Sequence, residues 1–150
     1  MIKAIVIYDT RHGNTKTVAE GITKGIGASG GIETELCFVE DVEMKRIPEY
    51  DIVVIGAPNH YGKPSKTTKE FVKKLKELEL EGKKFAAFDT CLRRQEGKAF
   101  GWIEKRMRRM FRSSRVISPG LSILVGGTKG PILEGELPKC EKFGRMIAEA

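Results

Sequence analysis

The sequence predicts a single α/β domain in which helices cover both faces of a parallel β-sheet. Its 150 residues are the size of one ordinary domain, and no internal repeat or linker divides them. A hydrophobic content of 40% with 31% charged residues is typical of a globular chain. Short apolar, β-branched segments alternate with longer amphipathic segments, and this alternation is typical of strands and helices in a parallel sheet.

The first half of the chain contains three predicted strands and one helix. Segments 2–8 and 51–57 are short, apolar and β-branched, which predicts buried strands. Segment 15–28 has apolar residues at helical spacing and ends at a Gly-Gly pair, which predicts a helix. Segment 32–39 alternates apolar and polar residues, as in a strand nearer the sheet edge. The intervening segment 40–48 is too short to assign.

The second half continues the alternation. Segment 65–80 has an apolar face opposite a lysine-rich face and is predicted to be a helix. Segment 84–89 is the next buried strand, and 97–111 is a second basic helix. Segment 115–125 is predicted to be a strand that a Pro-Gly pair interrupts. Segment 136–150 is a last amphipathic helix.

The composition excludes several classes of protein. The three cysteines (Cys37, Cys91 and Cys140) are far apart, and no C-x-x-C pair indicates a zinc site or a disulfide framework. We find no signal peptide, and no apolar run approaches the roughly 20 residues that span a bilayer. We therefore expect a cytoplasmic protein that does not bind a membrane.

The net charge of +7 is concentrated in one segment. Residues 93–115 contain nine basic and two acidic side chains, and the rest of the chain is balanced. Such a patch acts locally on partners and ligands. It leaves nucleic acid, an acidic partner or an anionic ligand open, and a plain solvated helix face is the simplest alternative.

The loop after the first strand is a predicted anion-binding turn. A turn between a strand and a helix directs backbone N–H groups and the positive helix end at one point, which suits a phosphate. The candidate residues are Thr10, Arg11, His12, Gly13, Asn14 and Thr15. The alternative is an ordinary turn in which Asn14 or Thr15 caps the helix.

Other nucleotide-binding folds do not fit. The G-x-x-x-x-G-K-[ST] loop is absent, and so is a G-x-G-x-x-G turn after the first strand. A phosphoacceptor receiver domain needs an Asp at the end of its third strand, where this chain has Gly56, Ala57 and Pro58.

The segment from Val6 to Ala19 resembles the flavodoxin family. The family signature reads apolar, apolar, aromatic, any, Thr/Ser, two of any, small, any, Thr, three of any, Ala, and all of its specified positions are met. The resemblance implies a flavodoxin-like three-layer sandwich whose five-stranded parallel sheet has the order 2-1-3-4-5. It also implies bound FMN, with the 5′-phosphate in the turn of residues 10–15.

The resemblance implies that two further loops hold the isoalloxazine ring. In the first, Asn59 follows Pro58 where the family usually has Thr, and either His60 or Tyr61 flanks the ring. The sequence does not choose between the two, and a polar loop tip is the alternative. Gly62 would permit a backbone rearrangement when flavin N5 becomes protonated.

The second ring loop follows the fourth predicted strand and resembles the family least. Asp89, Thr90, Cys91 and Leu92 are candidates, with contacts to the ring edge through backbone groups of 90–92. The loop has no aromatic residue, so we expect ring stacking from one side only. Cys91 is either a reactive thiol beside the arginines that follow it or, as we favour, a small residue fitted against the ring.

The predicted function is electron transfer by bound FMN between redox partners, with no catalytic side chain and no metal. The patch at 93–115 favours a redox partner with an acidic docking surface and raises the potential of the second one-electron reduction of FMN. It also suits a nicotinamide cofactor, whereas nucleic acid is disfavoured because no exposed aromatics interleave the cations. The alternatives are an FMN-dependent NAD(P)H:quinone oxidoreductase and a flavodoxin-fold binding module that uses the basic helix; the oligomeric state stays open.

Overall fold

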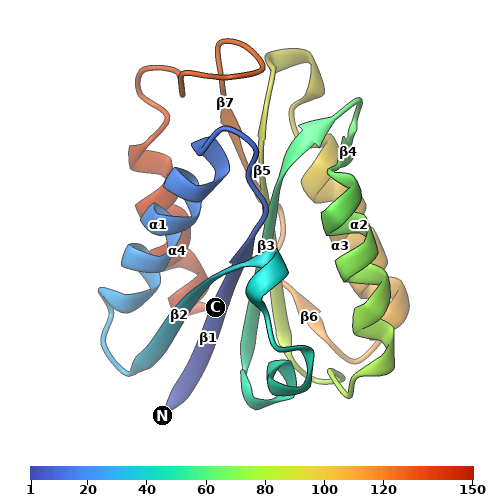
Figure 1. The fold of residues 1–150 in the computed structure, drawn as a ribbon. Helices are drawn as coiled ribbons and strands as arrows, with labels where there is room; N and C mark the ends of the chain where they lie inside the picture. The colour runs from blue at the N-terminus through green and yellow to red at the C-terminus, as the bar shows by residue number, and fades with distance from the viewer.

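A computed structural model describes all of residues 1–150 and shows three layers (Figure 1). The central sheet is flanked by α1 and α4 on one face and by α2 and α3 on the other. The strands are β1 (Ile2–Tyr8), β2 (Ile32–Phe38), β3 (Ile52–His60), β4 (Lys63–Pro64), β5 (Lys84–Cys91), β6 (Arg115–Val116) and β7 (Leu121–Leu124). The α-helices are α1 (Asn14–Gly27), α2 (Lys66–Lys74), α3 (Lys98–Met110) and α4 (Pro138–Glu149).

The sheet confirms the predicted topology. Its strand order is β2-β1-β3-β5-β6, and β7 continues the position of β6 beside the far end of β5. All of these pairings are parallel, so the five positions follow the order 2-1-3-4-5. The last strand is interrupted as expected, because Pro119 between β6 and β7 lacks the N–H that pairing with β5 needs.

Three local features differ from the predicted elements. β3 runs past 57 to His60 and turns back into β4, which makes a short antiparallel hairpin. α2 ends earlier than predicted, and the 3₁₀-helix Leu75–Glu77 follows it. Segment 40–48 contributes to two 3₁₀-helices, Val39–Asp41 and Met44–Glu49.

Alternate strand residues build two separate cores. Ala4 and Val6 of β1 pack in the core beneath α1 and α4, whereas Ile5 and Ile7 pack in the core beneath α2 and α3. This division follows from the two-residue period of a strand, which directs successive side chains to opposite faces. Apolar residues fill both directions because helices cover both faces of the sheet.

Glycines allow α1 and α4 to pack at close range. A β-carbon at Gly144 would lie 2.2 Å from the carbonyl oxygen of Ile22, and one at Gly25 would lie 2.1 Å from that of Glu141. Both neighbours are backbone atoms of the facing helix, which cannot rotate away. The close packing of α1 against α4 therefore requires glycine, which has no β-carbon, at both positions.

We expect Gly144→Ala to lower the free energy of unfolding by about 2 kcal/mol, because the new methyl group forces the helices apart. Gly27→Ala is the matched control at the end of α1, where nothing lies within 4 Å of the added carbon. It should stabilise the chain by about 0.5 kcal/mol, since Ala restricts the unfolded chain. Urea unfolding of both variants measures the difference, and equal effects would contradict the packing argument.

No helix in the structure combines the length and the apolar character needed to traverse a lipid bilayer.

Candidate functional site

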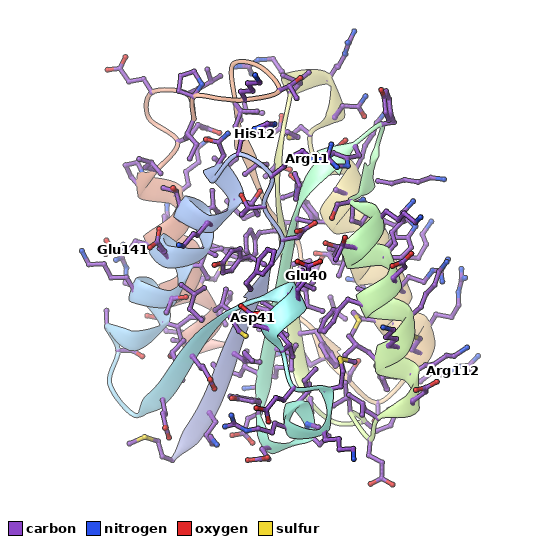
Figure 2. All side chains as sticks on the ribbon, viewed as in Figure 1. Arg11, His12, Glu40, Asp41, Arg112 and Glu141 are labelled. Carbon is purple, nitrogen blue, oxygen red and sulfur yellow. The ribbon has the colours of Figure 1, made fainter.

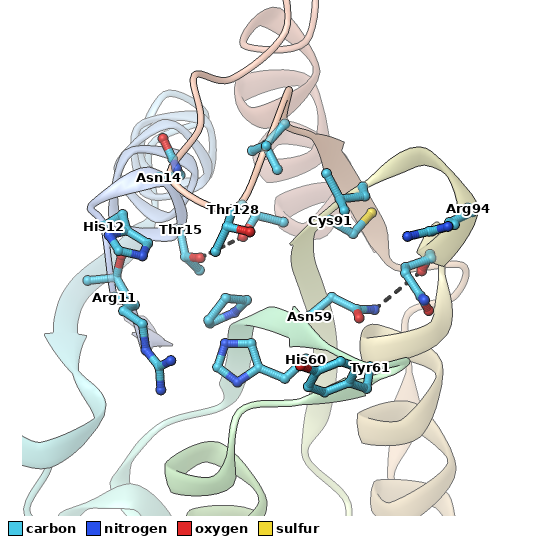
Figure 3. A pocket seen from close by; sticks show the side chains of 17 residues that line it. Arg11, His12, Asn14, Thr15, Asn59, His60, Tyr61, Cys91, Arg94 and Thr128 are labelled. Carbon is cyan, nitrogen blue, oxygen red and sulfur yellow. Dashed lines mark hydrogen bonds between the residues drawn. The ribbon is translucent and has the colours of Figure 1, made fainter.

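A cavity of about 340 Å³ opens where β1, β3, β5 and β7 end (Figure 3). This is the edge at which α/β sheets bind ligands, and the volume lies within the range of small-molecule sites. Seventeen residues from four loops line it: Thr10, Arg11, His12, Asn14, Thr15, Pro58, Asn59, His60, Tyr61, Thr90, Cys91, Leu92, Arg94, Gln95, Val125, Gly127 and Thr128.

The loop after β1 presents an uncapped helix N-terminus to this cavity. α1 begins at Asn14, preceded by Gly13 with a φ of 89°, and neither a side-chain cap nor an acidic residue occupies its first turn. The Thr17 N–H donates to the Gly13 carbonyl at 3.1 Å, so the earlier N–H groups of the helix precede its hydrogen-bond ladder. The alternative in which Asn14 or Thr15 caps the helix is therefore wrong.

A hydrogen bond between Thr15 and Thr90 ties the first loop to the end of β5. Their hydroxyl oxygens are 2.8 Å apart, and both side chains are almost fully buried. Both residues line the cavity, and a dashed line in Figure 3 marks the hydrogen bond from Thr15. The pair fixes the position of the α1 N-terminus relative to the strand that carries the third loop.

The hairpin between β3 and β4 forms another wall. Asn59 Oδ1 accepts the Gly62 N–H at 2.9 Å, and its Nδ2 donates to the Gln95 carbonyl at 3.3 Å. Asn59 thus closes the hairpin and connects it to the loop after β5. Tyr61 at the tip has a φ of 55° and is 99% exposed, so its ring is free to cover a ligand.

The surroundings of His60 disfavour its charged form. Burial, together with the nearby Arg11 guanidinium, lowers its pKa from the usual 6.5. Figure 3 shows Arg11 extending toward the His60 ring from the first loop. His60 and Tyr61 are the only aromatic or imidazole rings besides His12 that line the cavity, so any stacking comes from the hairpin side.

The loop after β5 divides its predicted residues between cavity and interior. Thr90, Cys91 and Leu92 line the cavity, but Asp89 is fully buried and does not. Burial, followed by the charge of Asp89, raises the pKa of the Cys91 thiol to about 12. Cys91 is thus not a thiolate at neutral pH, which contradicts the reactive-thiol alternative and agrees with a small packing residue.

Gly13 and Gly62 also lie outside the lining and act through the backbone. Each has a positive φ, 89° and 84°, that ordinary side chains rarely adopt. Cys37 is partly buried and Cys140 is fully buried, and both are free thiols away from the cavity.

Five lining residues were not among the sequence candidates: Arg94, Gln95, Val125, Gly127 and Thr128. The first two belong to the same loop as Cys91, one turn further along. The other three follow β7, and the rule that ligands bind beyond strand ends also applies to that strand. The Gly126-Gly127 pair in this loop was the available signal.

The residues present fit a flat heteroaromatic ring that carries a phosphate. The exposed Tyr61 ring at the hairpin tip lines the cavity, and an aromatic side chain suits stacking on a flat ring. The uncapped N-terminus of α1 provides donors for a phosphate at the other end.

Comparisons with known proteins agree with this geometry. The family model described as "Flavodoxin domain" matches residues 5–128. The flavodoxin of Clostridium saccharobutylicum is 33% identical over 90 residues, which cover 60% of this chain and 56% of that protein. The Escherichia coli K12 protoporphyrinogen IX dehydrogenase [quinone] is 33% identical over 73 residues, covering 49% and 40% of the two chains. The chain spans about half the length of the curated flavodoxins it matches.

A solved structure extends the likeness over the whole chain. A flavodoxin from the domain Archaea superposes with a TM-score of 0.85 and 31% sequence identity, covering 99% of this chain and 97% of that one. The family model, the signature around the first loop and the strand order all lead to one assignment. The chain belongs to the flavodoxin family.

Proposed function

We propose that this chain binds FMN in the cavity and carries electrons between redox partner proteins. Flavodoxins bind FMN. The observation that carries the proposal is that one cavity combines an uncapped helix N-terminus with an exposed aromatic ring at the tip of the hairpin. FMN supplies the one- and two-electron chemistry, and the protein binds and tunes it.

The first loop is assigned to the phosphate. The first-turn N–H groups of α1 and the side chains of Thr10, Asn14 and Thr15 supply neutral donors, with Arg11 and His12 at the rim. Gly13 lets the backbone approach the phosphate closely. No atom of the protein lies within 4 Å of the position that a β-carbon at Gly13 would take.

The other loops are assigned to the ring. Tyr61 covers one face, and Pro58, Asn59 and His60 form the wall beside it. Gly62 shapes the turn behind Tyr61. Backbone groups of Thr90, Cys91 and Leu92 meet the ring edge, and Asp89 supports them from below by fixing the end of β5.

The proposed partner is a redox protein with an acidic docking surface. The excess of cations in 93–115 begins with arginines in the loop beside the cavity. Opposite charges steer association and make it depend on salt.

Two observations on the purified protein test this function. A yellow preparation with an FMN spectrum is expected. Anaerobic NADH or NADPH should then leave the spectrum unchanged, because an electron carrier takes electrons from a partner protein. Direct bleaching by the nucleotide would instead establish a reductase, the alternative that the match to the quinone-dependent dehydrogenase favours.

We expect Arg94→Gln to lower the potential of the second one-electron reduction of bound FMN by tens of millivolts, about 1 kcal/mol. Fully reduced FMN is anionic at neutral pH in this family, and Arg94 is the cation of the 93–115 patch that lines the cavity. Arg112→Gln is the matched control, since Arg112 lies at the opposite end of the molecule (Figure 2). A redox titration in which both variants shift equally would contradict this assignment.

A further inference from the structure

The fold brings two basic segments together that are separate in the sequence. Residues 63–76, which include α2, contain six lysines and one glutamate. Residues 98–115, which include α3, contain seven basic residues and one acidic residue, the buried Glu104. Both helices cover the same face of the sheet, and we call the surface that these two segments form the basic face.

The cations of the basic face are almost all without ion-pair partners. Arg108 makes its only salt bridge, with Glu104 at 3.8 Å. On the opposite side of the sheet, Lys24, Lys139 and Arg145 are each paired with a glutamate. Figure 2 shows the long nitrogen-tipped side chains of the basic face extending into solvent. The unneutralised positive charge is therefore concentrated on this side of the molecule.

The basic face is continuous with the cavity. Its residue Lys98, at the start of α3, lies beside the hairpin, because a β-carbon at Gly62 would be 3.5 Å from Lys98 Cδ. Arg94 in the preceding loop lines the cavity itself. From there α3 extends for 13 residues, about 20 Å, to Arg112 beyond its far end. A macromolecule that covers the N-terminal half of α3 also reaches the mouth of the cavity.

We propose that the basic face docks the redox partner through an acidic surface that contacts α2 and α3 together. This inference rests on the proposed function, and it extends the docking site from the single segment 93–115 to a two-helix surface. An acidic protein supplies carboxylates for the cations that lack partners, and such contacts give orientation and fast association. Docking there places the partner beside the mouth of the cavity.

The face is less suited to nucleic acid. Strand-tracking surfaces use exposed aromatic rings on which bases stack. The only aromatic side chain on the outer part of α3 is Trp102, which is half-buried and covered by the Arg106 guanidinium at 4.7 Å. The α3 helix also packs its apolar side into the core, so it does not project as a free helix into a groove.

A charge-reversal pair tests the proposal, with an acidic [2Fe–2S] ferredoxin as the probe. Lys73→Glu/Arg109→Glu changes one exposed cation on α2 and one on α3, and neither has an ion-pair partner. Lys45→Glu/Lys142→Glu is the matched control, with the same change in net charge at exposed positions outside that face. Dissociation constants are measured by calorimetry on the FMN-loaded and the FMN-free protein at about 50 and 300 mM salt.

We expect the basic-face variant to weaken ferredoxin binding by about tenfold or more at low salt, and the control by less than about twofold. High salt should remove most of the difference. Equal weakening by both variants would overturn the proposal, as would tighter binding of a 20-base-pair DNA duplex that the basic-face variant abolishes. Docking on the FMN-free protein is measured independently, so failure to bind FMN would refute the proposed function without deciding the docking result.

Discussion

Asn14→Asp is expected to weaken FMN binding by about 10- to 100-fold while leaving the fold intact. Asn14 is the first residue of α1 and lines the cavity, and no acidic residue occurs in this turn. The substitution preserves shape but places a carboxylate beside the phosphate site. Like charges repel there, and the Asn amide donor is lost, which together cost about 1.4 to 2.8 kcal/mol of binding free energy.

The apoprotein should respond in the opposite direction. A carboxylate in the first turn of a helix interacts favourably with the helix dipole, by about 0.3 to 1 kcal/mol. The midpoint temperature of thermal unfolding without FMN should therefore be equal to that of the unmodified protein or slightly higher.

Riboflavin separates a phosphate effect from general damage to the site, since it has the same ring without a phosphate. Fluorescence titrations should show nearly equal riboflavin affinity in the two proteins and a large loss for FMN only. An equal loss of affinity for both flavins would contradict the assignment of the phosphate to the first loop.

Much of the fold was predictable because each buried strand carries its own pattern. Ile2–Tyr8 is apolar at nearly every position, since helices cover both faces of its strand, and no tertiary information is needed to recognise it. The hairpin of β3 and β4 was not predictable in this way. Lys63–Pro64 is only two residues long and has no periodicity, so its pairing with His60 depends on the tight turn at Tyr61 and Gly62.

The residues of the site fall into the same two groups, those that a local pattern predicts and those that only the fold brings together. The first loop follows from a signature of consecutive residues, and the structure places all but Gly13 of its candidates in the cavity wall. Thr128 reaches the cavity through the packing of a distant segment, which no local pattern records. The pairing of α2 with α3 into one basic face is likewise a consequence of strand order, because residues 63–76 and 98–115 are separate in the sequence and only the fold places both on the same face of the sheet.

Asp89 is a buried carboxylate that supports the loop after β5. It is fully enclosed, and its Oδ2 accepts the Phe100 N–H of α3 at 2.9 Å. Its Oδ1 accepts the Ser122 hydroxyl at 2.7 Å, and the Ser122 oxygen accepts the Gly97 N–H at 2.8 Å. This network fastens β5, β7 and the start of α3 together beneath the cavity. Its protonation state therefore bears on stability.

Burial raises the pKa of Asp89 from 3.8 to about 6, against the opposing effect of these hydrogen bonds. The folded chain thus binds a proton more tightly than the unfolded chain does. The stabilising contribution of the protonated group is complete below about pH 4 and is lost as the pH rises through about 6. The free energy of unfolding should fall by about 3 kcal/mol across this window on account of Asp89.

Asp89→Asn is expected to abolish that dependence. The amide keeps an oxygen for the Phe100 N–H and offers an N–H to the Ser122 hydroxyl, so the network is retained without a titrating group. Urea unfolding between pH 4 and pH 8 measures the free energy of unfolding of both proteins. The histidines are common to both, so their titration cancels in the difference between the two free energies. The free energy of unfolding of the variant should rise relative to that of the unmodified protein as the pH rises. At pH 8 the variant should be at least as stable as the unmodified protein. A difference that stays constant with pH would show that Asp89 does not titrate in the folded chain within this window.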